Sequence, residues 1–358
     1  MKLSKLSLSI AGAVAAALTM SACSGSSSDA GENTSLVVAM GHEAPYPGEE
    51  AVMYAIPKGL GLFEKYGIDV QFQPTAGSGV AIQLVQAGEA DLGQGNPSSV
   101  MAAVDKGVDI KVVYNIIPTY GSGLAVLPDS PITSPKDLAD TTIGVASLSS
   151  SRLPEAQAMV AEAGLTDSVE FVAVGVGAQA ASALTSGKVD GLYLWDAAYK
   201  SIELSGTPLR VIRDVFTESA QLLDFVQYAS ADAIENKADA IEKLGKAAAV
   251  AHAWAKENPE KALDLFYEEF PNARSDEAGR QRDLAILTFT LEQFDPEGTD
   301  QSGFGDTPEK RTTTTAKFLA DHQLIPKALA AEEYVDNQFV PAYNEGVEDD
   351  LAQLSGKE

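Results

Sequence analysis

Two short loops carry residue types that could hold a small anion. They are Gly77-Ser78-Gly79 and Asn96-Pro97-Ser98-Ser99, each between a strand-like segment and the start of a helical one. A helix N-terminus offers unpaired backbone N–H groups and a partial positive charge, and serine hydroxyls add further donors. The pattern therefore predicts ligand contact at both loops. The alternatives are a tight turn for the glycine loop and plain helix capping for the other.

The sequence shows no spacing typical of a catalytic or metal centre. Its three histidines, His42, His252 and His322, lie far apart in different segments. None of them has a Cys, His or Glu partner at a spacing that suggests a zinc site. No Gly-x-Ser-x-Gly elbow accompanies a base. We therefore predict no catalytic residue, no cofactor and no metal, and a protein that is not an enzyme.

Strands alternating with helices must position the two loops. Ile68, Val70 and Phe72 alternate with polar residues as in a half-buried strand. Similar units continue to about residue 212, which predicts a mainly parallel sheet with ligands at the carboxyl ends of its strands. Ser134-Pro135-Lys136-Asp137 predicts a further helix start. From residue 230 onward the pattern is helical without strands, and this tail is expected to pack against the first lobe.

The first 22 residues are typical of a secretory signal peptide. The segment Met20-Ser21-Ala22-Cys23 is similar to the lipobox of bacterial lipoproteins, which implies cleavage before Cys23 and lipidation of its thiol. The alternative is an incidental thiol. Residues 23–35 then predict a flexible tether. We expect an extracytoplasmic protein anchored to the bacterial cell membrane by the lipid on Cys23.

Length and charge narrow the possibilities further. A chain of 358 residues exceeds what one compact core usually holds, so two lobes are expected. With 51 acidic and 25 basic residues the net charge is −26, which argues against nucleic acid as a partner. Cys23 is the only cysteine, so the sequence excludes an internal disulfide.

Several short segments, in their order and spacing, resemble the substrate-binding proteins of ABC importers. The resemblance is to the branch for nitrate, sulfonates, taurine and thiamine-pyrimidine precursors. It rests on Gly61 to Val70, Gly88 to Gly93, Ser130 to Leu138, Gly187 to Asp190 and Trp195-Asp196. It implies an α/β fold of the type II periplasmic binding protein class, with two α/β lobes, a ligand cleft and a helical C-terminal region.

The resemblance also implies that the chain crosses twice between the lobes. The first part of lobe 1 is then residues 36–118, lobe 2 is residues 119–214, and the mostly helical second part of lobe 1 is residues 215–350. The second crossing falls near Asp214 to Asp224.

In that family the ligand is held by the loops that follow the strands. Carried over to this chain, the ligand-binding residues are Pro45, Tyr46, Gly77, Ser78, Gly79, Asn96, Pro97, Ser98, Ser99, Tyr120, Ser149, Ser150, Ser151, Arg152, Trp195 and Asp196. Hydroxyl and N–H donors suit an oxyanion, whereas aromatic faces suit a flat or apolar body.

Several of these residues also have a purely structural interpretation. Arg152 is either solvated or, if it faces the cleft, the best partner for an anion. Tyr46 and Tyr120 are ligand contacts or core and hinge aromatics, and Trp195 is a ligand platform or a core residue. Asp196 is a helix cap or an acceptor for an amine. The acidic residues Glu43, Glu49 and Glu50 would repel an anion if they faced the cleft.

We therefore predict a monomeric, lipid-anchored protein that captures a small-molecule ligand and delivers it to an ABC permease. The donors and Arg152 favour a sulfonate such as taurine, whereas the acids and aromatics favour a nitrogen heterocycle such as a thiamine-pyrimidine precursor.

Two alternative functions stay open. One is an enzyme of the same fold, similar to the pyrimidine-precursor synthases, although their signature needs several cysteines. The other is a ligand-sensing surface lipoprotein.

Overall fold

The computed structural model describes residues 33–355, apart from 43–44, 119, 217–220 and 275. The predicted signal peptide, Cys23 and most of the predicted tether lie outside the described residues. The predicted end of the tether at Ser35 is wrong, because Thr34 and Ser35 already pair with the second strand. Within the described ranges, no helix combines the length and the apolar character needed to cross a bilayer.

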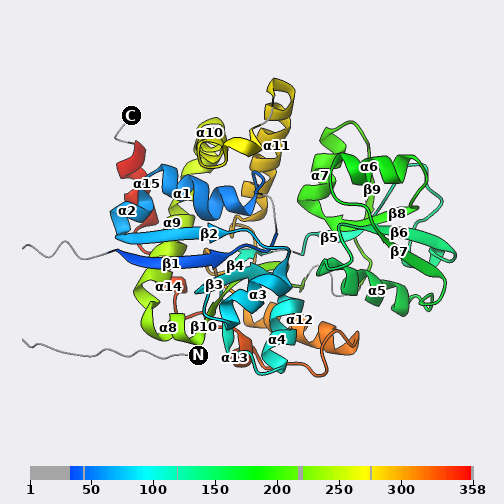
Figure 1. Ribbon diagram of the computed structural model, residues 1–358, viewed down its shortest axis with the longest axis horizontal. Helices are drawn as coiled ribbons and strands as arrows, with labels where there is room; N and C mark the ends of the chain where they lie inside the picture. Colours follow the sequence, from blue (N-terminus) through cyan, green and yellow to red (C-terminus); the bar gives the residue numbers. More distant parts are fainter. Residues whose placement is uncertain (1–32, 43–44, 119, 217–220, 275, 356–358) are drawn as a thin grey trace, which may run out of the picture. The chain divides into compact units, whose positions relative to one another are not determined.

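Five strands form the first sheet (Figure 1). Their order is β2 (Ile68–Gln73), β1 (Thr34–Ala39), β3 (Leu92–Gly95), β10 (Phe225–Ser230) and β4 (Ile110–Ile117). β1 runs parallel to β2 and β3, whereas β10 runs antiparallel to β3 and β4. β10 is missing from the predicted strands. Its first five residues are all buried, so it lacks the alternation that marks a half-buried strand.

Five further strands form the second sheet. Their order is β7 (Val169–Ala173), β6 (Thr141–Val145), β8 (Gly191–Trp195), β5 (Ser122–Val126) and β9 (Arg210–Ile212). β6 is parallel to β7 and β8, whereas β5 is antiparallel to β8 and β9. The predicted α/β fold is confirmed. In each sheet four of the five strands run in the same direction, as the predicted mainly parallel sheet requires, and only the strand that enters from a crossing, β10 or β5, runs against them.

The chain passes between the two sheets twice. β4 of the first sheet is followed directly by β5 of the second, and β9 of the second sheet is followed by β10 of the first. The first crossing therefore falls between Ile117 and Ser122, and the second between Ile212 and Phe225. We call the first sheet with its helices lobe 1, and the second sheet with its helices lobe 2.

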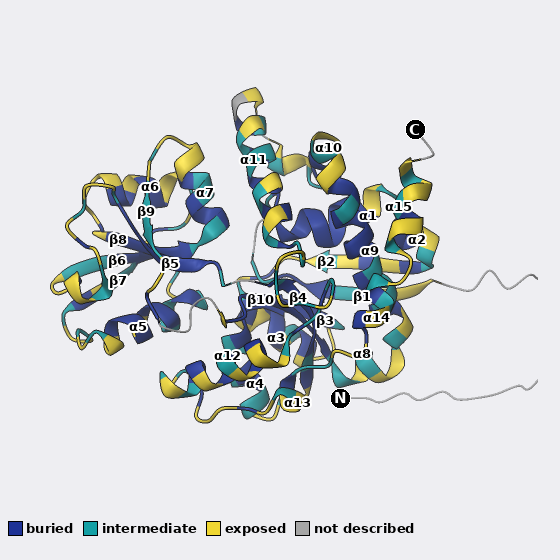
Figure 2. Cartoon of the chain, turned by 180° about the vertical axis from the view of Figure 1, so that it is seen from behind, coloured by how far each residue is buried: buried dark blue, intermediate teal, exposed yellow. Residues whose placement is uncertain are grey.

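Helices cover both sheets and turn buried faces toward them (Figure 2). Lobe 2 carries α5 (Arg152–Glu162), α6 (Ala178–Thr185) and α7 (Asp196–Leu204). Lobe 1 carries α1 (Ile56–Gly59), α2 (Leu62–Tyr66), α3 (Ser78–Gln86), α4 (Pro97–Asp105), α8 (Ala231–Asn236), α9 (Ala238–Glu257), α10 (Pro259–Glu269), α11 (Glu277–Gln293), α12 (Glu309–Asp321), α13 (Ala331–Tyr334), α14 (Val340–Asn344) and α15 (Val347–Ser355).

Short segments that depart from the α-helix occur within the described ranges. The turn before α1, η1 (Ala51–Ala55), is π-helical, and Pro271–Ala273 is a 3₁₀ turn. The helix predicted to start at Ser134 is a 3₁₀ turn of three residues, Pro135–Asp137. Asp137 accepts hydrogen bonds from the backbone N–H groups of Thr133 and Ser134, so the predicted helix start is present as a capping box although the turn has only three residues.

The C-terminal helices pack on lobe 1 through close contact between α9 and α14. Gly245 of α9 faces the ring of Tyr343 in α14, and a Cβ at Gly245 would lie 2.3 Å from that ring. The Tyr343 hydroxyl donates a hydrogen bond to the carbonyl of Val113 in β4 at 3.0 Å. Glycine at position 245 therefore lets Tyr343 tie the helical layer to the sheet.

Replacing Gly245→Ala is expected to lower the free energy of unfolding by about 1–3 kcal/mol, because the methyl group overpacks the Tyr343 ring. The matched control is Gly79→Ala in α3, where an added Cβ meets no atom within 4 Å. That change should stabilise by about 0.5–1 kcal/mol, since alanine is the better helix former. Urea unfolding followed by circular dichroism measures both. Equal midpoints for the two variants would contradict this packing.

Candidate functional site

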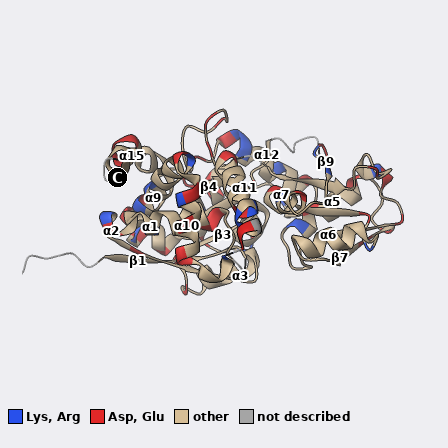
Figure 3. Ribbon diagram, turned by 90° about the horizontal axis from the view of Figure 1, so that it is seen from above, with Lys and Arg blue, Asp and Glu red and all other residues tan. Residues whose placement is uncertain are grey.

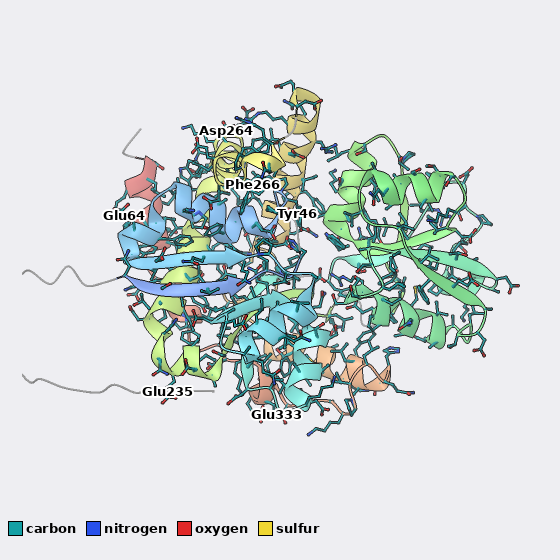
Figure 4. The ribbon with its side chains drawn as sticks, viewed as in Figure 1. Tyr46, Glu64, Glu235, Asp264, Phe266 and Glu333 are labelled. Carbon is teal, nitrogen blue, oxygen red and sulfur yellow. The ribbon has the colours of Figure 1, made fainter. Side chains whose placement is uncertain are left out.

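A cavity of about 730 Å³ is lined by residues of both lobes. Lobe 1 contributes the loops after β1 and β3, the start of α3 and one face of α11, and lobe 2 contributes the loops after β6, β7 and β8. Figure 4 shows Tyr46 on the side of lobe 1 that faces lobe 2. The volume suits a small organic ligand.

Most of the predicted ligand-binding residues line this cavity, namely Pro45, Tyr46, Gly77, Ser78, Asn96, Ser149, Ser150, Ser151, Arg152, Trp195 and Asp196. The structure does not place Gly79, Pro97, Ser98, Ser99 or Tyr120 in the lining. Gly79 and Pro97 to Ser99 lie in the first turns of α3 and α4. The Tyr120 hydroxyl instead donates a hydrogen bond to Glu155 Oε2 at 2.7 Å, which supports its interpretation as a core aromatic.

Other lining residues have no counterpart in the prediction. They include His42, Gly177 before α6, and Arg282 and Gln293 of α11. Glu49, which the sequence suggested only as a residue that would repel an anion in the cleft, lines the cavity too. α11 reaches the cleft through its contact with α7 of lobe 2, which joins segments far apart in the sequence. No local pattern signals such a contact.

Helix N-termini from both lobes converge on the cavity. α3 begins at Ser78, α5 at Arg152 and α6 at Ala178, and each of these residues lines the cavity. The serine hydroxyls of the loop after β6 lie beside them. Partial positive charges and N–H groups from several helices thus meet in one volume, which can hold an anion without a charged side chain.

Arg152 is buried, with 5% of its surface exposed. Its guanidinium donates to Glu155 Oε2 at 3.1 Å and forms an ion pair with Asp224. Burial alone would lower the pKa of Arg152, but the two carboxylates outweigh it and hold that pKa well above its usual value. The interpretation of Arg152 as solvated is therefore wrong. Its charge is already balanced by acids, so it is not a free cation for a ligand.

Asn96 and Asp224 link the lobes next to this arginine. The Asn96 amide donates to the backbone carbonyl of Asp224 at 2.9 Å, and Asn96 Oδ1 accepts a hydrogen bond from the Ser151 hydroxyl of lobe 2. Asp224 also accepts a hydrogen bond from the Gly121 N–H at 3.2 Å. The side chain of Asn96 makes no capping bond to α4, so plain helix capping is the wrong interpretation for Asn96.

Asp196 and Trp195 stand at the start of α7 on the opposite wall. Asp196 forms an ion pair with Arg213, and its other oxygen lies 3.4 Å from the Gln293 amide nitrogen of α11. The N-cap of α7 is Trp195 and Asp196 is its first helical residue, so Asp196 does not stand at the cap position. Trp195 is half-buried and lines the same cavity as Tyr46 of lobe 1. The contact between Asp196 and Gln293 joins the lobes across the cleft.

An acidic cluster with a histidine forms the wall of lobe 1. His42 Nε2 lies 2.9 Å from Glu49 Oε1 and 2.9 Å from Glu50 Oε1, and the Tyr46 hydroxyl donates to the other Glu49 oxygen. Burial alone would lower the pKa of His42, but the Glu50 and Glu49 carboxylates raise it well above its usual value. The sequence analysis predicted that no histidine has a glutamate partner placed as in a metal site. This is wrong for His42, because the chain folds back and brings Glu49 and Glu50 against its ring.

The chain belongs to a known family. The model of the family described as NMT1/THI5 like matches residues 51–262, more than half of the chain. No curated protein matches the sequence. The resemblance inferred from the sequence motifs, to the branch of binding proteins for sulfonates and thiamine-pyrimidine precursors, is thereby confirmed for family and fold.

Solved structures share the fold. The aliphatic sulphonate-binding protein SsuA from Escherichia coli is 17% identical with a TM-score of 0.63, over 85% of this chain and 92% of its own. The alkanesulfonate-binding protein SsuA from Xanthomonas axonopodis, bound to MOPS, is 16% identical with a TM-score of 0.62, over 86% and 100%. The desulfurization enzyme DszB is 16% identical with a TM-score of 0.54, over 87% and 99%. The fold thus serves both binding proteins and an enzyme.

The buried ion pair predicts unequal effects for two aspartate substitutions. Asp224→Ala leaves the Arg152 charge short of one partner and is expected to lower the free energy of unfolding by about 3 kcal/mol. The matched control is Asp264→Ala, which breaks the partly exposed pair with Arg280 and should cost less than about 1 kcal/mol. Chemical denaturation measures both. A cost for Asp224→Ala no larger than that of the control would contradict the central position of this pair.

Proposed function

We propose that this protein is an extracytoplasmic solute-binding protein of an ABC importer, monomeric and acting by binding and not by catalysis. It captures a small polar molecule between its lobes and delivers it to a permease. The observation that carries the proposal is a cavity lined by loops of both lobes, which two chain segments connect. Such an arrangement can close around a ligand by hinge motion. Family membership and the fold shared with sulfonate-binding proteins support it.

We propose a ligand with an anionic head, such as an alkanesulfonate or the zwitterion taurine. The N-termini of α3, α5 and α6 and the serine hydroxyls offer many donors to such a group. Because Arg152 is already paired, these neutral donors supply the recognition.

A second ligand class has its own support. Glu49 lines the cavity beside the aromatic rings of Tyr46, Trp195 and Phe225. A carboxylate among aromatic faces suits a protonated nitrogen heterocycle, as in a thiamine-pyrimidine precursor. The two ligand classes carry opposite charges. A single substitution that adds a charge to the cavity can therefore distinguish them.

Replacing Ala178→Asp places a negative charge at the exposed start of α6, where an acidic residue favours the helix. The fold is therefore expected to be as stable as before. Titration calorimetry should show binding of ethanesulfonate and taurine to the unchanged protein. The aspartate should weaken it at least about tenfold, equivalent to about 1.4 kcal/mol. The matched control is Ala178→Asn, which adds the same volume without charge and should keep most of the affinity.

The opposite pattern would overturn the anion proposal. If an aminopyrimidine binds in place of the sulfonates, and binds more tightly to the aspartate variant, the cationic ligand class is correct. If none of these compounds binds, both ligand assignments fail while the fold stands.

We also propose that Cys23 anchors the protein through a lipid. Cys23→Ser removes the acceptor thiol and is expected to shift the protein from the membrane fraction to the soluble extracytoplasmic fraction. Intact-mass measurement should show an acyl-bearing mass for the unchanged protein and none for the variant. A membrane-bound serine variant, or an unchanged protein without added lipid mass, would contradict the anchor. The control is Ser24→Ala, the adjacent residue, which should leave the distribution as it is.

A further inference from the structure

The His42-Glu49-Glu50 cluster brings three metal-ligating side chains together on one wall of the cleft. One ligand atom from each lies within 4.8 Å of the other two. Glu49 and Glu50 begin the helical segment whose next five residues form the π-helical turn η1. Departures from regular α-helix of this kind are frequent at functional sites. Charged residues of both signs are otherwise dispersed over the ribbon of both lobes (Figure 3).

Glu50 lacks the hydrogen bonds that a buried carboxylate requires. The residue is fully buried, and neither of its carboxylate oxygens has a hydrogen-bond partner among the described residues. Its nearest cationic group is His42 Nε2, which is equally close to Glu49. One imidazole N–H cannot satisfy acceptors on two carboxylates. A buried carboxylate whose one ion-pair partner is shared with a second carboxylate, and which accepts no hydrogen bond, is costly and calls for an explanation.

We propose that His42, Glu49 and Glu50 bind a divalent transition-metal ion such as Zn²⁺ at the wall of the cleft. An imidazole nitrogen and carboxylate oxygens are ligands that Zn²⁺ accepts. The ion would take the place of the imidazole proton, which leaves with solvent, and its two charges would balance two carboxylates. His42 Nε2 now lies 2.9 Å from one oxygen of each glutamate. These atoms need to move slightly apart so that each can lie about 2.0–2.2 Å from an ion between them.

The surroundings of the cluster also fit a metal site. The Tyr46 hydroxyl donates to the Glu49 oxygen that does not face His42, and a hydrogen bond of this kind orients a metal-ligating carboxylate. His42 and Glu49 line the cavity, whereas Glu50 is fully buried and does not line it. Three protein ligands leave a coordination position open toward the cavity. The site does not depend on the transport role proposed above.

The test is Zn²⁺ titration of the purified protein without a polyhistidine tag, after treatment with EDTA and dialysis. The unchanged protein is expected to take up one equivalent, measured by calorimetry and by elemental analysis after gel filtration. Glu50→Gln keeps the shape of the side chain but removes a charged ligand, and should weaken binding by at least about tenfold. The matched control is Glu155→Gln, which alters another buried glutamate that also accepts a tyrosine hydrogen bond but lies beside Arg152. It should retain the Zn²⁺ affinity.

Two results would overturn the metal site. One is no stoichiometric uptake by the unchanged protein. The other is equal Zn²⁺ affinity in Glu50→Gln, which would place the ion elsewhere, for example at His322, 3.8 Å from Glu162. If Glu50→Gln does not fold, His42→Gln gives the same comparison at a side chain that is 27% exposed. Loss of sulfonate binding with intact Zn²⁺ uptake would contradict the proposed ligand and leave the metal site standing.

Discussion

The buried charge of Arg152 is the constraint on which the centre of this molecule depends. A guanidinium in that position is tolerated only with acids close by, and they come from α5 and from the second crossing. Asp224 is held in turn by Gly121 of the first crossing and by Asn96 of lobe 1. Both crossings, the start of α5 and the start of α4 thus meet at one ion pair, beneath the cavity that the lobes share.

The pairing of Arg152 with two acids determines which groups of the cavity remain able to bind a ligand. Because the acids already hold Arg152, the donors that remain are backbone N–H groups at helix starts and serine hydroxyls. These groups carry no full charge, and the cavity that they line also contains Glu49 and His42. A ligand must satisfy both the donors and the acidic wall, which favours a small molecule with a polar head over a simple inorganic anion. A metal ion at His42 would make the acidic wall a second place for an anionic group.

Local patterns predicted much of the fold. The alternation at Ile68, Val70 and Phe72 does form β2, and the loops at Gly77 and Asn96 do reach the cavity. The sequence analysis did not predict β10, because this strand is buried on both faces between two antiparallel neighbours and its residues show no alternation of apolar and polar types. The mainly parallel direction of the strands was predicted, but the reversed strands β10 and β5 were not, since their direction is set by where the crossings deliver them.

The site was less predictable than the fold, because its contacts join distant segments. Nothing near Arg152 in the sequence indicates that Asp224 lies against it. The contribution of α11 to the cleft depends on its packing with α7. The His42 cluster needs acids at seven and eight positions later, a spacing that brings them together only because the loop folds back over the helix start. The partners of Arg152, α11 and His42 are therefore set by tertiary packing, which residue types along the sequence do not reveal.

Fold and family do not by themselves determine activity, since binding proteins and a desulfurization enzyme share this architecture. The central claim is that the cleft holds a small molecule by an anionic head. Native mass spectrometry of the freshly purified protein, with the bound component released and its accurate mass determined, tests it most directly. The account predicts a co-purified molecule whose composition includes a sulfonate or a similar anionic group. A bound molecule that carries only cationic nitrogen groups would contradict it.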